Sequence, residues 1–273
     1  MKYEEKYCNK TQKLLHLSKI CESVMLKVFQ SLVDAIVPDR CTICNKPLLG
    51  SYRVNKWGQK ACVDHNLAFC TSCGRYVLPS DLCTPDGRHT CSECIGKVVR
   101  KPEHIEWVYS RVAAIFERNF LALPGKIPVE IVTAEQMQAL HSTPLSGVKM
   151  SSGLTVSRGV NFFCAPMQHK VYILDYHHKV VFGGILAHEL LHVWQNEHHI
   201  ELPKNYCEGF CNLGSYLFYT YLDNELSQKH AQWMLESQDP IYGEGFRQVK
   251  AIFEREGGRN LEKTMEILVK KSR

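Results

Sequence analysis

The strongest constraint on the fold of this chain is a helical segment that must hold two histidines and a glutamate together. His188, Glu189 and His192 form an H-E-x-x-H pattern, and neither Pro nor Gly occurs from Ile185 to Glu197. Helical residues four apart share a face, so both imidazoles can reach one zinc ion, with Glu189 beside them as a general base. Apolar neighbours indicate a buried helix at about residues 180–197. The pattern favours zinc ligation over two histidines that hydrogen-bond within the core.

A third zinc ligand is expected, because catalytic zinc usually has three protein ligands and one open position. His198 lies six residues after His192, but that arrangement needs a Gly at which the chain leaves the helix, and Gln195 stands there. Glu208 follows a break at Pro203, begins a second apolar segment and would complete a two-His, one-Glu set. We predict Glu208 as the ligand and a solvated His198. An acidic residue favoured in the first turn of a helix is compatible with that role.

Pairs of Cys and His before residue 95 predict two structural zinc sites. Each site has two pairs of ligands, and two residues separate the members of each pair. Seventeen residues lie between the pairs, a spacing typical of tetrahedral structural zinc sites. The expected ligands are Cys41, Cys44, Cys62 and His65 for the first site, and Cys70, Cys73, Cys91 and Cys94 for the second. A disulfide framework is the alternative, but no secretory signal peptide is evident, and C-x-x-C pairs in an intracellular chain favour metal. We interpret Cys83 and His89, inside the second loop, as bystanders.

Composition narrows the classes of partner. The chain of 273 residues has a formal net charge of +5, spread along the sequence without a dense basic stripe, so nucleic acid is not expected. No apolar run reaches the length of a membrane span, so no membrane partner is expected. The length and a hydrophobic content of 45% predict one or two packed domains.

Three parts are predicted along the chain. Residues 1–40 have apolar residues at helical spacing and are expected to form a helical leader. Residues 41–94 form a LIM-like double zinc module, whose metals supply the folding energy that its small core lacks. Residues 103–273 are expected to form an α+β metallopeptidase domain with a gluzincin-like arrangement of helices around the zinc.

Within the α+β domain, strands are predicted at residues 129–133, 154–156 and 171–175. The H-E-x-x-H helix follows the third strand, and helical patterns dominate the rest of the chain. Since residues 171–175 come just before that helix, we expect this strand to edge the cleft and to pair with an extended peptide substrate.

The order of these modules resembles a known family. A LIM-like double zinc module followed by an H-E-x-x-H domain is similar to the ubiquitin-activated, LIM-domain-containing zinc metallopeptidases (DA-one-like) known from plants as regulators of organ size. The resemblance rests on residues 185–194 and on Glu208-Gly209, and covers roughly residues 41–222. It implies zinc ligands at His188, His192 and Glu208, a catalytic Glu189, and peptidase activity towards cytoplasmic regulatory proteins.

Three features depart from the pattern of that family. The second half of the first zinc site is Cys62-x-x-His65, where a LIM domain has His-x-x-Cys. The gap from His65 to Cys70 is longer than usual, and residues 1–40 show no acidic ubiquitin-interacting pattern. The chain is therefore expected to be a divergent or microbial relative. Ubiquitin or another regulatory protein is a candidate partner of the LIM-like module or the leader helix.

The predicted function is cytoplasmic cleavage of protein or peptide substrates by a zinc endopeptidase. Three zinc ions are expected, one catalytic and two structural. Catalytic zinc would lower the pKa of a bound water towards ~7, while Glu189 takes its proton and passes it to the leaving amine. The LIM-like module would bind a partner or the substrate. The alternative is a non-catalytic zinc-binding adaptor for protein–protein interaction, although a purely structural site has no need of Glu189.

Overall fold

The computed structural model describes residue 25 and residues 39–141, 151–158 and 167–273. The predicted leader at residues 1–40 lies almost wholly outside these described residues and stays a prediction. The chain divides into two compact units. The first contains Met1–Phe69 with Gly74–Pro79, and the second contains Cys70–Cys73 with Ser80–Arg273.

The first unit holds the first half of the cysteine-rich module. Its hairpin joins β1 (Tyr52–Val54) to β2 (Lys60–Cys62) in antiparallel register. The buried residues of its hydrophobic cluster are Cys41, Ala61 and Tyr76. A core this small supplies little folding free energy, so this unit depends on its metal-ligating residues for stability.

The second unit begins with the other half of that module. A short antiparallel hairpin, β3 (Leu82–Cys83) and β4 (His89–Thr90), precedes the single-turn helix α2 (Ser92–Ile95). Helix α3 (Pro102–Arg118) then starts at Pro102, whose missing N–H is tolerated at the first helical position.

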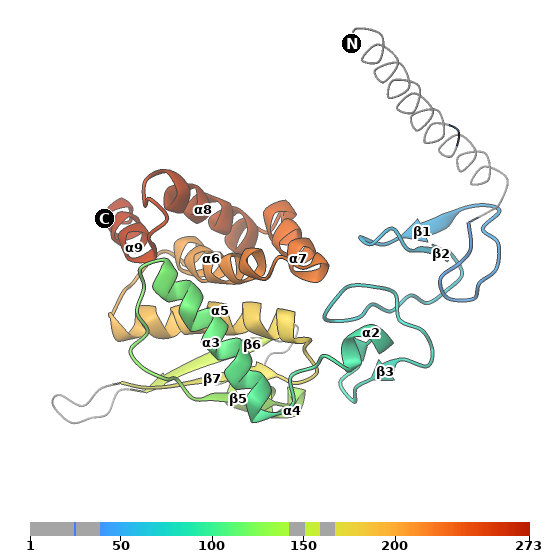
Figure 1. Cartoon of the computed structure of the whole chain (residues 1–273), viewed down its shortest axis with the longest axis horizontal. Helices are drawn as coiled ribbons and strands as arrows, with labels where there is room; N and C mark the ends of the chain where they lie inside the picture. Colours follow the sequence, from blue (N-terminus) through green and yellow to red (C-terminus); the bar gives the residue numbers. More distant parts are fainter. Residues whose placement is uncertain (1–24, 26–38, 142–150, 159–166) are drawn as a thin grey trace, which may run out of the picture. The chain divides into compact units, whose positions relative to one another are not determined.

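A three-stranded sheet forms one layer of the second unit (Figure 1). Its order is β5 (Val129–Val132), β7 (Gln168–Leu174) and β6 (Gly153–Arg158), with β7 parallel to β5 and antiparallel to β6. All three predicted strands are confirmed. The expectation that residues 171–175 edge the cleft is wrong, because β7 is the central strand.

The burial pattern of β7 explains its central place. Val171 and Ile173 face the main hydrophobic core, whereas Tyr172 and Leu174 join a separate cluster that includes Met137 of α4 (Ala134–Leu140). Consecutive side chains of a strand point to opposite faces, so both faces of β7 are covered. A strand covered on both faces has a continuous apolar run, as this one does, and gives no direct sign of which edge is free.

The predicted H-E-x-x-H helix is confirmed as α5 (Lys179–Glu197). The elements that follow α5 are α6 (Lys204–Leu222), α7 (Glu225–Glu236), the π-helical turn η1 (Pro240–Glu244), α8 (Gly245–Arg255) and α9 (Leu261–Lys271). Helix α5 lies between the sheet and α6, and also contacts α3 (Figure 1). No helix in the described ranges is long and apolar enough to cross a membrane.

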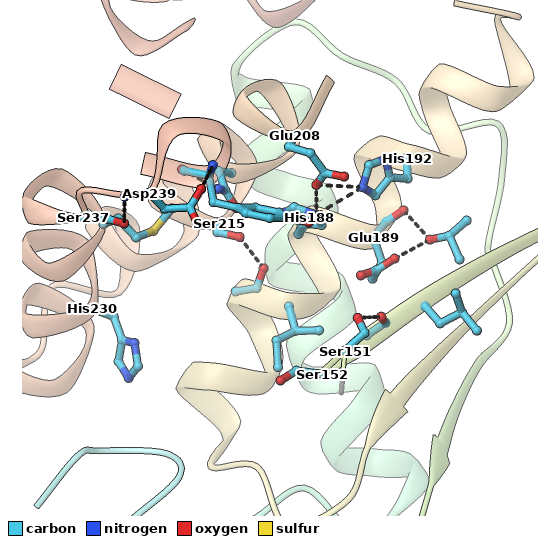
Figure 2. Close-up of a pocket in the computed structure, with 18 of the residues that line it drawn as sticks. Ser151, Ser152, His188, Glu189, His192, Glu208, Ser215, His230, Ser237 and Asp239 are labelled. Carbon is cyan, nitrogen blue, oxygen red and sulfur yellow. Dashed lines mark hydrogen bonds and ion pairs between the residues drawn. The ribbon is translucent and has the colours of Figure 1, made fainter. Parts of the chain in front are cut away.

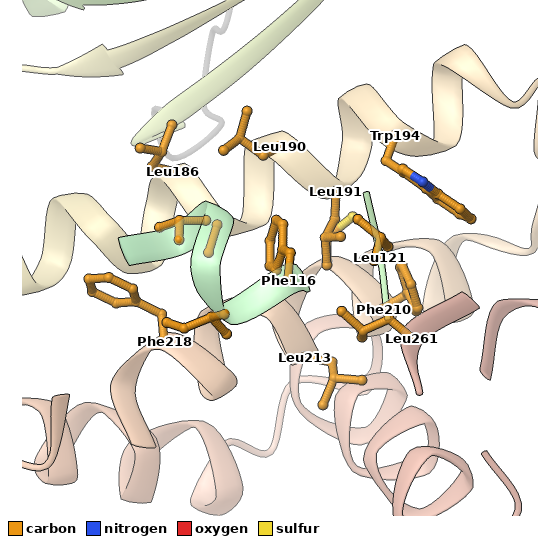
Figure 3. Close-up of a cluster of buried hydrophobic side chains, with 14 of the residues drawn as sticks. Phe116, Leu121, Leu186, Leu190, Leu191, Trp194, Phe210, Leu213, Phe218 and Leu261 are labelled. Atoms are coloured by element: carbon orange, nitrogen blue, oxygen red, sulfur yellow. The ribbon is translucent and has the colours of Figure 1, made fainter. Parts of the chain in front are cut away.

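Figure 3 shows how α5 is held in this core. Leu186 and Leu190 point towards the strands, and Leu191 lies on the side of α6. On that side the two helices approach closely at glycine. A Cβ at Gly183 would lie 2.1 Å from Cζ of Phe218, so a hydrogen is the only side chain that fits. The cost of a glycine within a helix is offset by this contact.

We predict that Gly183→Ala destabilises the protein by about 1–3 kcal/mol, because the added methyl group must push α5 away from the Phe218 ring. The midpoint of denaturant unfolding measures the change. Gly96→Ala is the matched control, because Gly96 has ordinary right-handed backbone angles and a Cβ there meets nothing within 4 Å. A Gly183→Ala variant as stable as this control would contradict the close-packing explanation.

Candidate functional site

Helices α5 and α6 bring three predicted ligands together (Figure 2). His188 and His192 lie one turn apart on α5, with their Nε2 atoms 3.1 Å apart. Glu208, near the start of α6, has its Oε2 3.3 Å from Nε2 of His188 and 3.6 Å from Nε2 of His192. Two ligand atoms about 2.1 Å from a tetrahedral zinc lie about 3.4 Å apart. The spacing and chemistry of these three donors therefore fit zinc.

His188, His192 and Glu208 form a ligand triangle, and the charges in this triangle favour a bound cation. Burial raises the pKa of Glu208, but hydrogen bonds and charge interactions with His188 and His192 outweigh burial and bring it to about 2. Burial lowers the pKa of His192, yet hydrogen bonds to Cys207 and Glu208 and the nearby negative charges raise it to about 10. The Glu208 carboxylate is thus ionised at neutral pH, and the site stabilises positive charge next to it.

The far side of each imidazole is held by other side chains. Nδ1 of His188 lies 3.0 Å from Oδ1 of Asn212, whose amide nitrogen donates to the carbonyl oxygen of Tyr242 at 2.8 Å. Because an amide oxygen accepts only, it favours a proton on Nδ1 and leaves the Nε2 lone pair directed towards Glu208. Gln195 has an equivalent place, with Oε1 3.3 Å from Nδ1 of His192.

Cys211 is a further candidate ligand that sequence reasoning missed. Together with His188 and His192 it forms a group whose ligand atoms lie within 4.8 Å of one another. Its Sγ lies 3.3 Å from Nδ1 of His192, which is the ring nitrogen opposite the Nε2 that faces His188. The thiol is therefore behind the imidazole, and Glu208 is the better third ligand. Its position three residues after Glu208, on the same face of α6, was the available sequence signal.

Strand β6 holds Glu189 beside the ligand triangle. Thr155 Oγ1 donates to Oε2 of Glu189 at 2.7 Å and also lies 3.0 Å from its carbonyl oxygen. A Cβ at Gly153 would lie 2.6 Å from Oε1 of the same carboxylate, so the strand can approach this closely only with glycine. Glu189 is 7% exposed, and its orientation is fixed by β6. The roles of Thr155 and Gly153 depend on tertiary packing and have no signature in the sequence.

His198 lies at the end of α5. Its ring stacks on Trp194 with 4.2 Å between the ring centroids, and its Nδ1 donates to the Trp194 carbonyl oxygen at 2.8 Å. The chain reverses at His199, which has a positive φ of 50°. These contacts place His198 against Trp194 at the end of α5, and it is absent from the described residues that line the cavity beside Glu208.

A cavity of about 1160 Å³ opens onto the triangle. Its first wall is formed by Ser151 and Ser152 with the first residues of β6, up to Thr155, and its second wall is formed by α6, α7 and η1. His230, on α7, lies at one end of the view in Figure 2. Glu189 and the imidazoles line the same cavity, so an extended ligand can reach all of them.

Both cysteine-rich clusters fit zinc, since the four ligand atoms of each lie within 4.8 Å of one another. In the first cluster Sγ of Cys44 is 3.9 Å from Sγ of Cys62, and in the second the Cys73 and Cys91 sulfurs are 3.7 Å apart. Sulfurs on a tetrahedral zinc are separated by about 3.8 Å. Nε2 of His65 is buried without a hydrogen-bond partner among the described residues, as expected of a nitrogen that binds metal.

Cys83 and His89 face one another across the β3–β4 hairpin, with the sulfur 4.0 Å from Nε2. Neither belongs to a metal-ligand cluster of the described chain.

These features define a class of protein in which a LIM-like double zinc module is joined to a mixed helix-and-sheet domain. No family model and no solved structure matches the chain. Among curated proteins, it is 23% identical over 227 residues to LIM domain-containing protein HDR3 of Oryza sativa subsp. japonica, covering 68% of this chain and 45% of that protein. It is 24% identical over 225 residues to Protein DA1-related 2 of Arabidopsis thaliana, covering 66% and 42%. These matches confirm the predicted resemblance, and the chain spans less than half the length of either relative.

The choice between the two candidate third ligands gives a direct prediction. Glu208→Ala should lose zinc from the triangle, because only two imidazoles and a displaced thiol remain, whereas Cys211→Ser should keep it. Metal analysis of the purified variants measures the zinc content per chain. His198→Ala should also keep the full content. Loss of zinc in Cys211→Ser with retention in Glu208→Ala would reverse the assignment.

Proposed function

We propose that this chain is a zinc endopeptidase with a gluzincin-like site. The observation that carries the proposal is the convergence of His188, His192 and Glu208 in a cavity that also holds the buried carboxylate of Glu189. Two histidines and one glutamate leave a tetrahedral position open for chemistry, unlike the four-ligand clusters. We propose residues 103–273 as the peptidase domain and the LIM-like module as a binding site for a partner or substrate.

The residues around the triangle have separable roles in hydrolysis. Zinc, when bound, would acidify water and polarise the scissile carbonyl group. Glu189 accepts the proton of the attacking water and delivers it to the leaving amine. Thr155 holds the Glu189 carboxylate through its hydroxyl group, and Asn212 keeps the His188 imidazole in the required tautomer.

The edge of β6 is suited to bind an extended peptide. Among the described residues, β6 pairs with β7 alone, so the backbone groups of its outer edge are available for another strand. Thr155 lies on this strand and bonds to Glu189, so a peptide paired with β6 passes beside the catalytic carboxylate. Main-chain pairing recognises an extended segment and supports endopeptidase cleavage of unfolded regions.

We also propose a cytoplasmic location and a regulatory protein as the partner. Free thiols in both clusters suit a reducing cytoplasm, where C-x-x-C pairs hold metal. The LIM domain in the name of the rice relative supports partner binding by the module, with ubiquitin or another regulatory protein as the candidate. A non-catalytic adaptor is the second candidate, and Glu189 separates the two because an adaptor does not need it.

Glu189→Gln should retain zinc, and its rate of cleavage should fall by about 10²–10⁴-fold, because an amide cannot take a proton from water. The measurements are zinc content and proteomic identification of cleavage sites in an unfolded protein mixture. Cleavage that persists at the wild-type sites and rate in this variant would contradict the proposed mechanism.

Thr155→Val should lower the rate of cleavage by about tenfold with zinc retained, because it removes the hydrogen bond that orients Glu189 while keeping the side-chain volume. Thr155→Ser keeps the hydroxyl group and should recover most of the rate. Equal rates for the Val and Ser variants would show that orientation by Thr155 has no catalytic effect.

A further inference from the structure

The second cysteine cluster is packed against the H-E-x-x-H helix. Its residues Cys70–Cys73 belong to the same compact unit as the cavity. The chain that leaves this cluster pairs with the segment leading into α5. The amide of Val99 donates to the carbonyl oxygen of His177 at 3.1 Å, and the amide of Lys179 donates to that of Lys97 at 3.0 Å. The first residue of α5 is therefore hydrogen-bonded to the segment that directly follows the second cysteine cluster.

We call the contact between the second cysteine cluster and the start of α5 the joint, and Ser72 lies at its centre. It lies between two cluster cysteines, Cys70 and Cys73, and is 1% exposed. Its Oγ accepts a hydrogen bond from the backbone N–H of His178 at 2.9 Å, and its carbonyl oxygen accepts one from Nε2 of His230 at 2.8 Å. One residue of the metal-binding turn thus contacts both the start of α5 and the α7 wall of the cavity.

Both residues held by Ser72 are placed to affect the site. The imidazole of His178 caps α5, since its Nδ1 accepts a hydrogen bond from the N–H of Val180 at 3.1 Å. His230 lines the cavity and stacks on Tyr219, with 5.1 Å between ring centroids. Tyr219 in turn packs against Gly184 of α5, where a Cβ would lie 2.1 Å from its hydroxyl oxygen.

A charged contact fixes the joint at a third point. Arg88, next to β4, donates from Nη1 to the carbonyl oxygen of Asp175 at 2.7 Å and from Nη2 to its Oδ1 at 2.6 Å. Its Nε donates to Asp86 at 2.6 Å, so all three nitrogens of the guanidinium are used. Asp175 directly follows the central strand β7. Both side chains are mostly buried, and the guanidinium makes two hydrogen bonds to Asp175. This contact therefore fixes the relative position of the two residues better than an exposed ion pair does.

We propose that the second cysteine cluster supports the peptidase site from outside it: metal held by Cys70, Cys73, Cys91 and Cys94 keeps Ser72 and Arg88 in place, and these two positioning residues align α5 and the cavity wall. The inference rests on the proposed peptidase function. A metal-binding turn of this size keeps its conformation only while its ligands are bound. Small displacements of a catalytic helix lower the rate of reaction strongly, so occupancy of this cluster controls cleavage without contributing a group to the catalytic centre.

The test compares Ser72→Ala with Thr71→Ala in the full chain. Thr71 is an exposed neighbour in the same turn, and its side chain makes no hydrogen bond within the described residues. Ser72→Ala should lower kcat on fluorescein-labelled casein about tenfold, while zinc content stays that of the wild type. It should also speed hydrogen exchange of the amides in residues 177–182. Thr71→Ala should change none of these quantities. Unchanged kcat and exchange in Ser72→Ala would overturn the proposal.

A second pair of variants tests the charged contact. Arg88→Ala should lower kcat with zinc retained, and Arg88→Lys, which can keep one bond to Asp175, should recover part of it. Cys94→Ser should lose the metal of the second cluster and most cleavage, yet still hold zinc at the triangle. Full activity of a Cys94→Ser protein lacking that metal would also overturn the proposal.

The two proposals fail in different ways. If the wild-type chain cleaves no protein, the peptidase function is wrong, but hydrogen exchange at residues 177–182 still decides whether Ser72 aligns α5. If the wild type cleaves and Ser72→Ala matches it in kcat and exchange, only the joint is wrong.

Discussion

The close packing of α5 on α6 is the constraint on which the rest of the site depends. Glycines at the contact let aromatic side chains of α6 lie against the backbone of α5, at Gly183 with Phe218 and at Gly184 with Tyr219. With the helices this close, a carboxylate near the start of α6 reaches the two imidazoles of α5. A methyl group at either glycine would separate the helices and enlarge the ligand triangle, so the apolar core and the polar site are set by the same contact.

The sheet constrains α5 from the side opposite to α6. Strand β6 approaches α5 so closely that only glycine fits at position 153, and Thr155 bonds to Glu189 from the same face of the strand. Glu189 is thus held between a strand and a helix that are both fixed by the core. Its carboxylate faces the strand edge, while the imidazoles face Glu208. One helix thus presents Glu189 to strand β6 and its two imidazoles to Glu208 of α6.

The features that could be predicted from the sequence are those with local periodicity. The spacing of His188, Glu189 and His192 on one helix, and the x-x pairs of the cysteine clusters, depend on backbone geometry that holds in any fold. The central place of β7 could not be predicted in this way, because strand order depends on pairing with distant segments. Cys211 and Thr155 escaped notice for a related reason: each acquires its contacts only when α5, α6 and β6 pack together.

The two cysteine clusters look alike in sequence, yet they lie in different structural surroundings. The first forms a unit with its own small core, whereas the second shares a unit with α5. Its Ser72 bonds to His178, which caps α5, and the nearby Arg88 bonds to Asp175 at the end of β7. Equal spacing of ligands therefore does not imply equal roles. The turn of the second cluster bonds to the residue that caps α5, because Ser72 accepts the backbone N–H of His178. Among the described residues no other group accepts that N–H, so a displaced turn would leave it without a partner.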